Sequence, residues 1–94
     1  MDDQTENIVH LQINGELDLH SFSPRDISSV VEEYIEECIK KEIYLIKIIH
    51  GKGKGIQRSI VHALLKKDPR VEWFGLDHSS SGWGATIVHI NKPR

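Results

Sequence analysis

Apolar residues recur every three or four positions in two stretches of the chain, which is the spacing of one buried helix face. The first stretch runs from Ile27 to Ile39 and follows Ser23-Pro24-Arg25-Asp26. In that tetrapeptide serine can cap a helix, proline suits the first helical position and aspartate complements the positive end of the helix dipole. The second stretch runs from Ile56 to Lys67 and stops before Pro69. We expect its inward residues to be Ile56, Ile60, Ala63 and Leu64.

Three other segments have the composition of β-strands. Residues 43–49 are nearly continuously apolar, which predicts a strand buried on both faces. Residues 71–76 and 85–90 are bounded by polar or turn-forming residues and predict two further strands. The polar loop between them, 77–84, is longer than a tight hairpin requires, which favours a functional role for it.

The N-terminal region predicts a hairpin. Asn14-Gly15 separates residues 8–13 from Glu16-Leu17-Asp18-Leu19-His20, and Asn-Gly between extended segments is a strong hairpin signal. Within the second segment the leucines share one face and Asp18 and His20 share the other, because side chains alternate along a strand. An additional N-terminal strand over residues 8–13 is therefore expected.

The order strand, helix, strand, helix, strand, strand predicts an α/β two-layer sandwich. Strands separated by helices are normally parallel, so this βαβαββ unit should form a mixed four-stranded sheet with both helices on one face. A chain of 94 residues suits one core. We expect residues 1–7 to be a flexible tail and residues 8–94 to form a single domain.

The composition indicates where in the cell the protein is expected. The single cysteine, Cys38, has no internal disulfide partner, and its place on an apolar helix face predicts a buried thiol. No apolar run approaches the roughly 20 residues that span a bilayer, and the acidic N-terminus is unlike a secretory signal. We therefore expect a cytoplasmic monomer that does not associate with membranes.

The segment His50-Gly51-Lys52-Gly53-Lys54-Gly55 has the composition of an anion-binding loop. It lies between a predicted strand and a predicted helix, where glycines allow close backbone approach and helix-terminal N–H groups attract negative charge. The spacing matches neither G-x-x-x-x-G-K-[ST] nor G-x-G-x-x-G, which argues against a P-loop or a dinucleotide site. The alternative is a flexible, solvated turn.

Charge is unevenly distributed although the net charge is −2. Residues 26–42 contain six acidic residues against Lys40 and Lys41. Between residues 47 and 67 no acidic residue occurs, and the six basic residues there are Lys47, Lys52, Lys54, Arg58, Lys66 and Lys67. A local positive field on an otherwise acidic body can steer a polyanion.

Two separate segments are expected to meet at one site. Asp18-Leu19-His20 and the His50 loop both follow predicted parallel strands, and ligands gather at the carboxyl ends of such strands. Two imidazoles beside a phosphate could act as general base and general acid in phosphodiester cleavage, each contributing about 10²–10⁴-fold. Lysines, Arg58 and loop amides would stabilise the developing charge. With RNA the 2′-hydroxyl can be the nucleophile, so no metal is strictly required.

Each of these residues also has a structural interpretation. Asp18 and His20 could be ordinary exposed strand residues, and the ring of His50 could bond to backbone. Asp18 could orient an imidazole, act as a base or bind a divalent metal ion. Trp83 could pack over the sheet edge or stack on a base, a contact worth roughly 1–3 kcal/mol.

The other histidines are not expected to be catalytic. His62 falls on the less apolar side of its helix and should face solvent, while His10 and His89 lie in strand patterns and His78 lies in the long loop. The histidines have no zinc-finger spacing and no partner cysteines, so we expect no structural zinc site.

Three motifs in this order resemble the Smr (small MutS-related) domain family. They are Leu17-Asp18-Leu19-His20, His50-Gly51-Lys52-Gly53 and a closing Gly82-x-Gly84-Ala85-Thr86-x-Val88. The resemblance covers roughly residues 16–90 and implies a stand-alone member with a βαβαββ sandwich, similar to the C-terminal domain of bacterial translation initiation factor three.

The resemblance also implies a function. Smr domains are associated with nucleic-acid binding and endonuclease activity, on nicked or branched DNA in some members and on RNA, including messenger RNA at stalled ribosomes, in others. It implies roles for Asp18, His20, His50, Gly51 and Gly53. The family's first motif commonly continues with glycine, where this chain has Ser21.

We therefore predict a nucleic-acid endonuclease in which Asp18, His20 and His50 are catalytic. The predicted nucleic-acid contacts are Gly51, Lys52, Gly53, Lys54, Arg58 and Trp83. Two alternatives are a binding module without chemistry and a protein-interaction domain that uses the acidic helix over residues 26–42.

Overall fold

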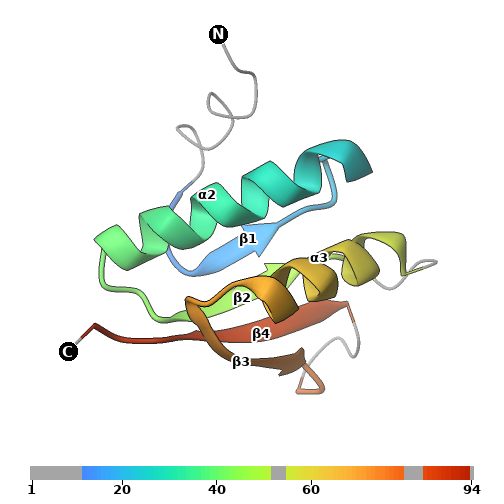
Figure 1. The fold of residues 1–94 in the computed structure, drawn as a ribbon. Helices are drawn as coiled ribbons and strands as arrows, with labels where there is room; N and C mark the ends of the chain where they lie inside the picture. Colours follow the sequence, from blue (N-terminus) through green and yellow to red (C-terminus); the bar gives the residue numbers. More distant parts are fainter. Residues whose placement is uncertain (1–11, 52–54, 80–83, 94) are drawn as a thin grey trace, which may run out of the picture.

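The computed structural model describes residues 12–51, 55–79 and 84–93, which form the predicted α/β two-layer sandwich (Figure 1). Its elements in chain order are β1 (Glu16–Asp18), a 3₁₀ turn η1 (Pro24–Asp26), α2 (Ile27–Lys40), β2 (Leu45–Ile49), α3 (Ile56–Lys67), β3 (Val71–Leu76) and β4 (Ala85–Ile90). Within these residues no helix is long and apolar enough to cross a membrane.

The sheet is mixed and has the strand order β1-β2-β4-β3. β1 pairs with β2 in parallel, whereas β4 lies antiparallel to both β2 and β3. Both helices lie on the same face of this sheet, and the other face is open (Figure 1). The carboxyl ends of β1 and β2 therefore reach the same edge of the molecule as the start of α3.

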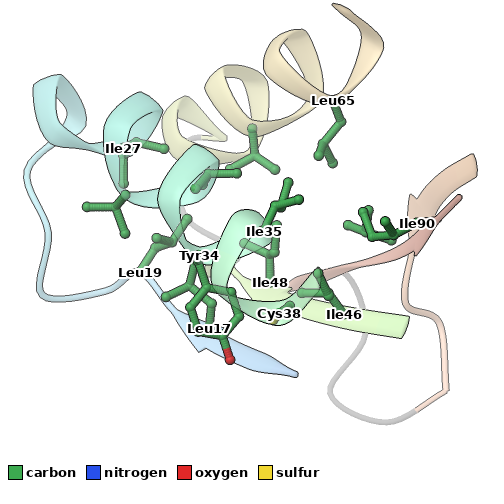
Figure 2. Packing of buried hydrophobic residues seen from close by; sticks show 14 residues of the cluster. Leu17, Leu19, Ile27, Tyr34, Ile35, Cys38, Ile46, Ile48, Leu65 and Ile90 are labelled. Atoms are coloured by element: carbon green, nitrogen blue, oxygen red, sulfur yellow. The ribbon is translucent and has the colours of Figure 1, made fainter. Parts of the chain in front are cut away.

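The core lies between the helices and the covered sheet face (Figure 2). Leu17, Ile46, Ile48 and Val88 alternate with more exposed residues along their strands, and each is at most 1% exposed. α2 covers them with its periodic stripe of Ile27, Val30, Val31, Tyr34, Ile35 and Cys38. The predicted burial of the Cys38 thiol is confirmed, and burial raises its pKa to about 11.

The prediction of a strand buried on both faces over residues 43–49 is wrong. β2 begins at Leu45, which is 59% exposed, while Ile46 and Ile48 are fully buried. The physical reason is the two-layer architecture, which leaves one sheet face without a covering layer.

The residues that the second helix buries also differ from those predicted. In α3 the fully buried residues are Val61 and Leu65, with Ile60 and Leu64 partly buried beside them. Ile56 is 56% exposed and Ala63 is exposed. Val61 and Leu65 stand one turn apart, so they define the stripe that meets the sheet.

The predicted hairpin at Asn14-Gly15 does not form in the described residues. Gln12 and Ile13 lie outside any strand, and residues 1–11, which include the predicted tail and most of the predicted first strand, lie outside the described residues. Gly15, at φ +93°, instead leads into the parallel pairing, because its carbonyl accepts a 2.7 Å hydrogen bond from the Lys47 amide.

Candidate functional site

The ends of β1 and β2 lie side by side, as the motif order predicted. Asp18 is in register with Ile49, and the Leu19 amide donates a 2.8 Å hydrogen bond to the Ile49 carbonyl. The next residue along β2 is His50, so the two motif segments are backbone neighbours at one edge of the sheet.

Their side chains nevertheless separate onto opposite faces of the sheet. Asp18 shares the open face with Ile49, and its side chain is 49% exposed. His50 follows the alternation of Ile46 and Ile48 onto the covered face and is only 6% exposed. The site thus has an exposed part and a buried part.

The exposed part is a carboxylate–imidazole pair. His20 Nδ1 lies 2.9 Å from Asp18 Oδ1, and the His20 amide donates to the same oxygen at 3.0 Å. Burial alone would raise the pKa of Asp18, but the hydrogen bonds from His20 outweigh it and hold that pKa below its ordinary value. The His20 side chain is 79% exposed, so an ionised Asp18 orients an imidazole that solvent and ligands can reach.

The turn after His20 closes without the usual glycine. The Phe22 amide donates to the Leu19 carbonyl at 3.0 Å, and among the described residues Glu42 is the non-glycine residue with a positive φ. Ser21 therefore holds this turn in an ordinary conformation. Gln57, in the first turn of α3, donates its amide to the carbonyls of Leu19 at 3.4 Å and Phe22 at 3.1 Å, which ties the turn to α3.

The buried part consists of two imidazoles around one hydroxyl. Thr86 Oγ1 lies 2.8 Å from His50 Nε2 and 2.7 Å from His62 Nε2, and Thr86 is fully buried. The His62 ring also packs edge-on against Phe74, with ring centroids 5.1 Å apart. The prediction that His62 faces solvent is wrong, because α3 is rotated so that this residue borders the buried stripe.

The buried His50 and the partly buried His62 both favour the neutral form. Burial lowers the pKa of His50, and the positive charge of Arg58 lowers it further against an opposing hydrogen bond to the Gly51 carbonyl. Burial likewise lowers the pKa of His62, with additional contributions from His50 and Arg58. Neither Thr86 nor His62 was identified as a site residue from the sequence. Thr86 could have been found, because it belongs to the third Smr motif, whereas no motif includes His62.

The beginning of the glycine loop is bonded to the protein itself. The amides of His50 and Gly51 both donate to the Gly84 carbonyl at 2.9 Å, and His50 Nδ1 lies 3.1 Å from the Gly51 carbonyl. The Gly51 amide is thus engaged in the fold, and the role of Gly51 as a nucleic-acid contact stays a prediction. Lys52, Gly53, Lys54 and Trp83, also predicted as contacts, lie outside the described residues.

Arg58 lies at the same end of the molecule. Gly55 precedes α3 with a φ of +79°, and the Arg58 guanidinium folds over it, with Nη2 2.7 Å from the position that a Cβ on Gly55 would take. The positive charge of Arg58 contributes to the lowered pKa values of His50 and His62. Its role as a nucleic-acid contact stays a prediction.

The remaining candidates are less suited to chemistry. His89 lies on the open face of β4 with its ring 5.2 Å from that of Trp73, His78 is exposed, and His10 is outside the described residues. Within the described part of the chain no group of three or more His, Cys, Asp or Glu side chains is placed to hold a metal ion.

Known proteins with similar sequences include endonuclease MutS2 from several bacteria. Endonuclease MutS2 of Acetivibrio thermocellus is 33% identical over 79 residues, covering 83% of this chain and 10% of that protein. Endonuclease MutS2 of Pelotomaculum thermopropionicum is 32% identical over 80 residues, covering 84% and 10%. The chain thus spans about a tenth of the length of these relatives.

Solved structures agree with the sequence relatives. The Smr domain of Thermus thermophilus MutS2 superposes with a TM-score of 0.78 at 28% identity, covering 83% of this chain and 99% of that one. YdaL, a stand-alone small MutS-related protein from Escherichia coli, gives a TM-score of 0.74 at 27% identity, covering 87% and 67%. The family model of the Smr domain matches residues 17–91. The chain therefore belongs to the Smr domain family.

Proposed function

We propose that this domain binds nucleic acid at the edge formed by the ends of β1 and β2 and cleaves phosphodiester bonds there. The observation that carries the proposal is the exposed pair of Asp18 and His20 at the end of β1, beside the end of β2 and the start of α3. The endonuclease names of the MutS2 relatives support the same class of activity, although those proteins are about ten times longer.

His20 is the proposed proton-transfer group. Its Nδ1 is held by Asp18, so a neutral ring that donates from Nδ1 presents a basic Nε2 to solvent. That nitrogen can remove the proton from the attacking hydroxyl or water, while the bond from phosphorus to the leaving oxygen breaks and solvent protonates that oxygen. The ionised Asp18 stabilises the imidazolium that forms. Arg58, together with Lys52 and Lys54, would offset charge on the phosphoryl oxygens.

His50 has a different proposed role from the one predicted from the sequence. Its Nδ1 is bonded to Gly51, its Nε2 is bonded to Thr86, and its pKa is lowered by burial. These contacts leave no ring nitrogen directed at a ligand. We assign His50 to holding the start of the glycine loop.

The test uses labelled RNA and labelled nicked DNA with purified protein. His20→Ala should lower the rate of cleavage by about 10²-fold or more. His89→Ala is the matched control, because that histidine lies on the open face beside Trp73, and it should cleave at the wild-type rate. Equal rates for wild type and His20→Ala would overturn the assigned site.

The product ends identify the substrate and the nucleophile together. A cyclic phosphate with a 5′-hydroxyl on the other fragment would establish RNA cleavage through the 2′-hydroxyl. Cleavage of DNA, which has no 2′-hydroxyl, would require another nucleophile, such as water, and would show that the reaction does not depend on the 2′-hydroxyl. Repeating the assay with a chelator separates a metal-dependent reaction from one that needs only the side chains.

A binding domain without chemistry is the second candidate. The observation that favours it is the withdrawal of His50 from solvent, since this leaves His20 without a second imidazole to protonate the leaving oxygen. It predicts binding of single strands with no product after prolonged incubation. Lys52→Ala and Lys54→Ala should then weaken binding about equally.

A further inference from the structure

Thr86 joins two histidines that come from different elements. Its hydroxyl lies on β4, His50 follows β2 and His62 lies on α3, with Nε2-to-Oγ1 distances of 2.8 and 2.7 Å. A threonine hydroxyl has one hydrogen to donate and two lone pairs to accept with. At most one of the two imidazoles can therefore receive the Thr86 hydrogen.

The contact with Gly51 decides which imidazole receives it. His50 Nδ1 lies 3.1 Å from the Gly51 carbonyl, and a carbonyl only accepts, so Nδ1 of His50 carries a hydrogen. A neutral imidazole carries one hydrogen, which leaves Nε2 of His50 as an acceptor. The Thr86 hydroxyl therefore donates to His50 Nε2.

His62 must then be a donor. With the Thr86 hydrogen directed at His50, a lone pair of Thr86 Oγ1 faces His62 Nε2, so that nitrogen carries the hydrogen. We propose that His62 is a positioning residue that acts through Thr86 to hold His50 in its neutral, Nδ1-protonated form. The order of donation runs from His62 to Thr86, from Thr86 to His50, and from His50 to the Gly51 carbonyl.

This chain of hydrogen bonds fixes the entrance to the glycine loop. Gly51 has a φ of +82°, its carbonyl is held by His50 and its amide is held by the Gly84 carbonyl. The carbonyl of Ile49, the residue before His50, accepts a hydrogen bond from the amide of Leu19, which follows β1 and precedes His20. The consequence for cleavage rests on the proposed function, whereas the protonation pattern does not.

The surrounding charges act in the same direction. The positive charge of Arg58 on α3 lowers the pKa of His50. The ring of His62, also on α3, lies 6.0 Å from that of His50 between centroids, and Phe74 of β3 packs against His62 without a charge. Protonation of His50 would place a second hydrogen on Nε2, so Thr86 Oγ1 would have to accept from both imidazoles and its own hydrogen would lose its partner. Without the His62 donor, that hydrogen can turn toward the place where His62 donated while the oxygen accepts from His50, so the pKa of His50 should rise.

The direct test is the ¹⁵N NMR spectrum of the histidine rings in wild-type protein at pH 7. The expected result is a neutral His50 with hydrogen on Nδ1 and a His62 with hydrogen on Nε2. A His50 with hydrogen on Nε2, or a doubly protonated His50, would overturn the proposal. This measurement needs no variant and no enzymatic activity.

Variants of His62 test the causal role. His62→Phe keeps an aromatic ring against Phe74 and removes the donor, so the titration midpoint of His50 should shift upward. His62→Gln places an amide donor near the position of Nε2 and should keep the midpoint close to the wild-type value. If the midpoint is the same in wild type and both variants, His62 does not position His50.

Cleavage assays separate this inference from the proposed function. If the domain is a nuclease, His62→Phe should lower kcat severalfold and His62→Gln should restore most of it. If wild-type protein cleaves nothing while its ring spectrum shows the expected tautomers, the hydrogen-bond chain stands and the nuclease proposal fails. If cleavage occurs and the tautomers differ, the nuclease proposal stands and the chain fails.

Discussion

Burial gives three histidines of this domain three different capacities for proton transfer. His20 is 79% exposed in its side chain, His50 is 6% exposed, and His62 is partly buried against Phe74. An exposed imidazole can exchange protons with a substrate, whereas a buried one whose nitrogens are both bonded can only position its neighbours. The sequence motifs assigned the same catalytic role to His20 and His50, whereas the structure places their side chains on opposite faces of the sheet.

The carboxylate of Asp18 should titrate below its ordinary range because of His20. Its folded pKa is lowered, so its ionised form favours the folded state above the unfolded pKa, and that contribution disappears as the pH falls through the folded pKa. In His20→Ala the hydrogen bond from the ring is lost, and the Asp18 midpoint should rise. Carboxyl ¹³C chemical shifts followed from pH 2 to 6 give both midpoints. Identical midpoints would mean that the ring does not bond to Asp18 in solution.

Two glycines with positive φ should differ in their tolerance of alanine. At Gly51 (φ +82°) a Cβ would meet nothing within 4 Å, so Gly51→Ala should cost about 1–2 kcal/mol in the free energy of unfolding from backbone strain alone. At Gly15 (φ +93°) a Cβ would lie 3.1 Å from the Leu45 carbonyl oxygen and 3.2 Å from Ile43 Cγ2. Gly15→Ala should therefore be the more destabilising by roughly another 1 kcal/mol. Urea denaturation with unchanged slopes measures both; equal losses would contradict the crowding at Gly15.

At the scale of elements, the sequence predicted the existence and most bounds of the strands and helices, because these depend on the local pattern of residues. The strands at 71–76 and 85–90 have the observed bounds, and both helices exist where periodicity placed them. The errors concern which face a segment buries, at 43–49 and on α3, since this depends on the neighbouring layers. For the same reason the adjacency of Asp18 and His50 followed from topology, while the contacts of Thr86 with His62 required the packing of α3 on β4.

One buried hydroxyl connects α2 to the start of β1. The fully buried Tyr34 donates to the Glu16 carbonyl at 3.1 Å and accepts from the Gly15 amide at 3.1 Å. Tyr34→Phe would leave both backbone groups without this partner and should lower the free energy of unfolding by about 1–3 kcal/mol. Tyr44→Phe is the matched control, because Tyr44 is only partly buried and should change stability little. A Tyr34→Phe protein as stable as the control would show that water replaces the hydroxyl.

At the scale of the whole molecule, the basic segment 47–67 does not form one patch. Lys47 points to the open sheet face, where its ammonium lies 3.3 Å from Asp77 Oδ2. Lys66 and Lys67 lie at the end of α3, about 12 Å along the helix from Arg58. The charges left near the glycine loop are Arg58 and, by their place in the chain, Lys52 and Lys54.

This division of charge predicts a modest salt dependence of nucleic-acid binding. About three phosphate contacts on a single strand give a slope of log K against log salt near −2, whereas six contacts would give about −4. Arg58→Ala should reduce the slope by about 0.7, because one contact is lost. The double variant Lys66→Ala, Lys67→Ala, whose charges lie at the far end of α3, should leave the slope unchanged. Fluorescence anisotropy with a labelled single strand from 50 to 200 mM salt measures all three. A slope near −4 that falls in the double variant would show that the strand follows the full length of α3, and a slope of zero would exclude a polyanion as the ligand.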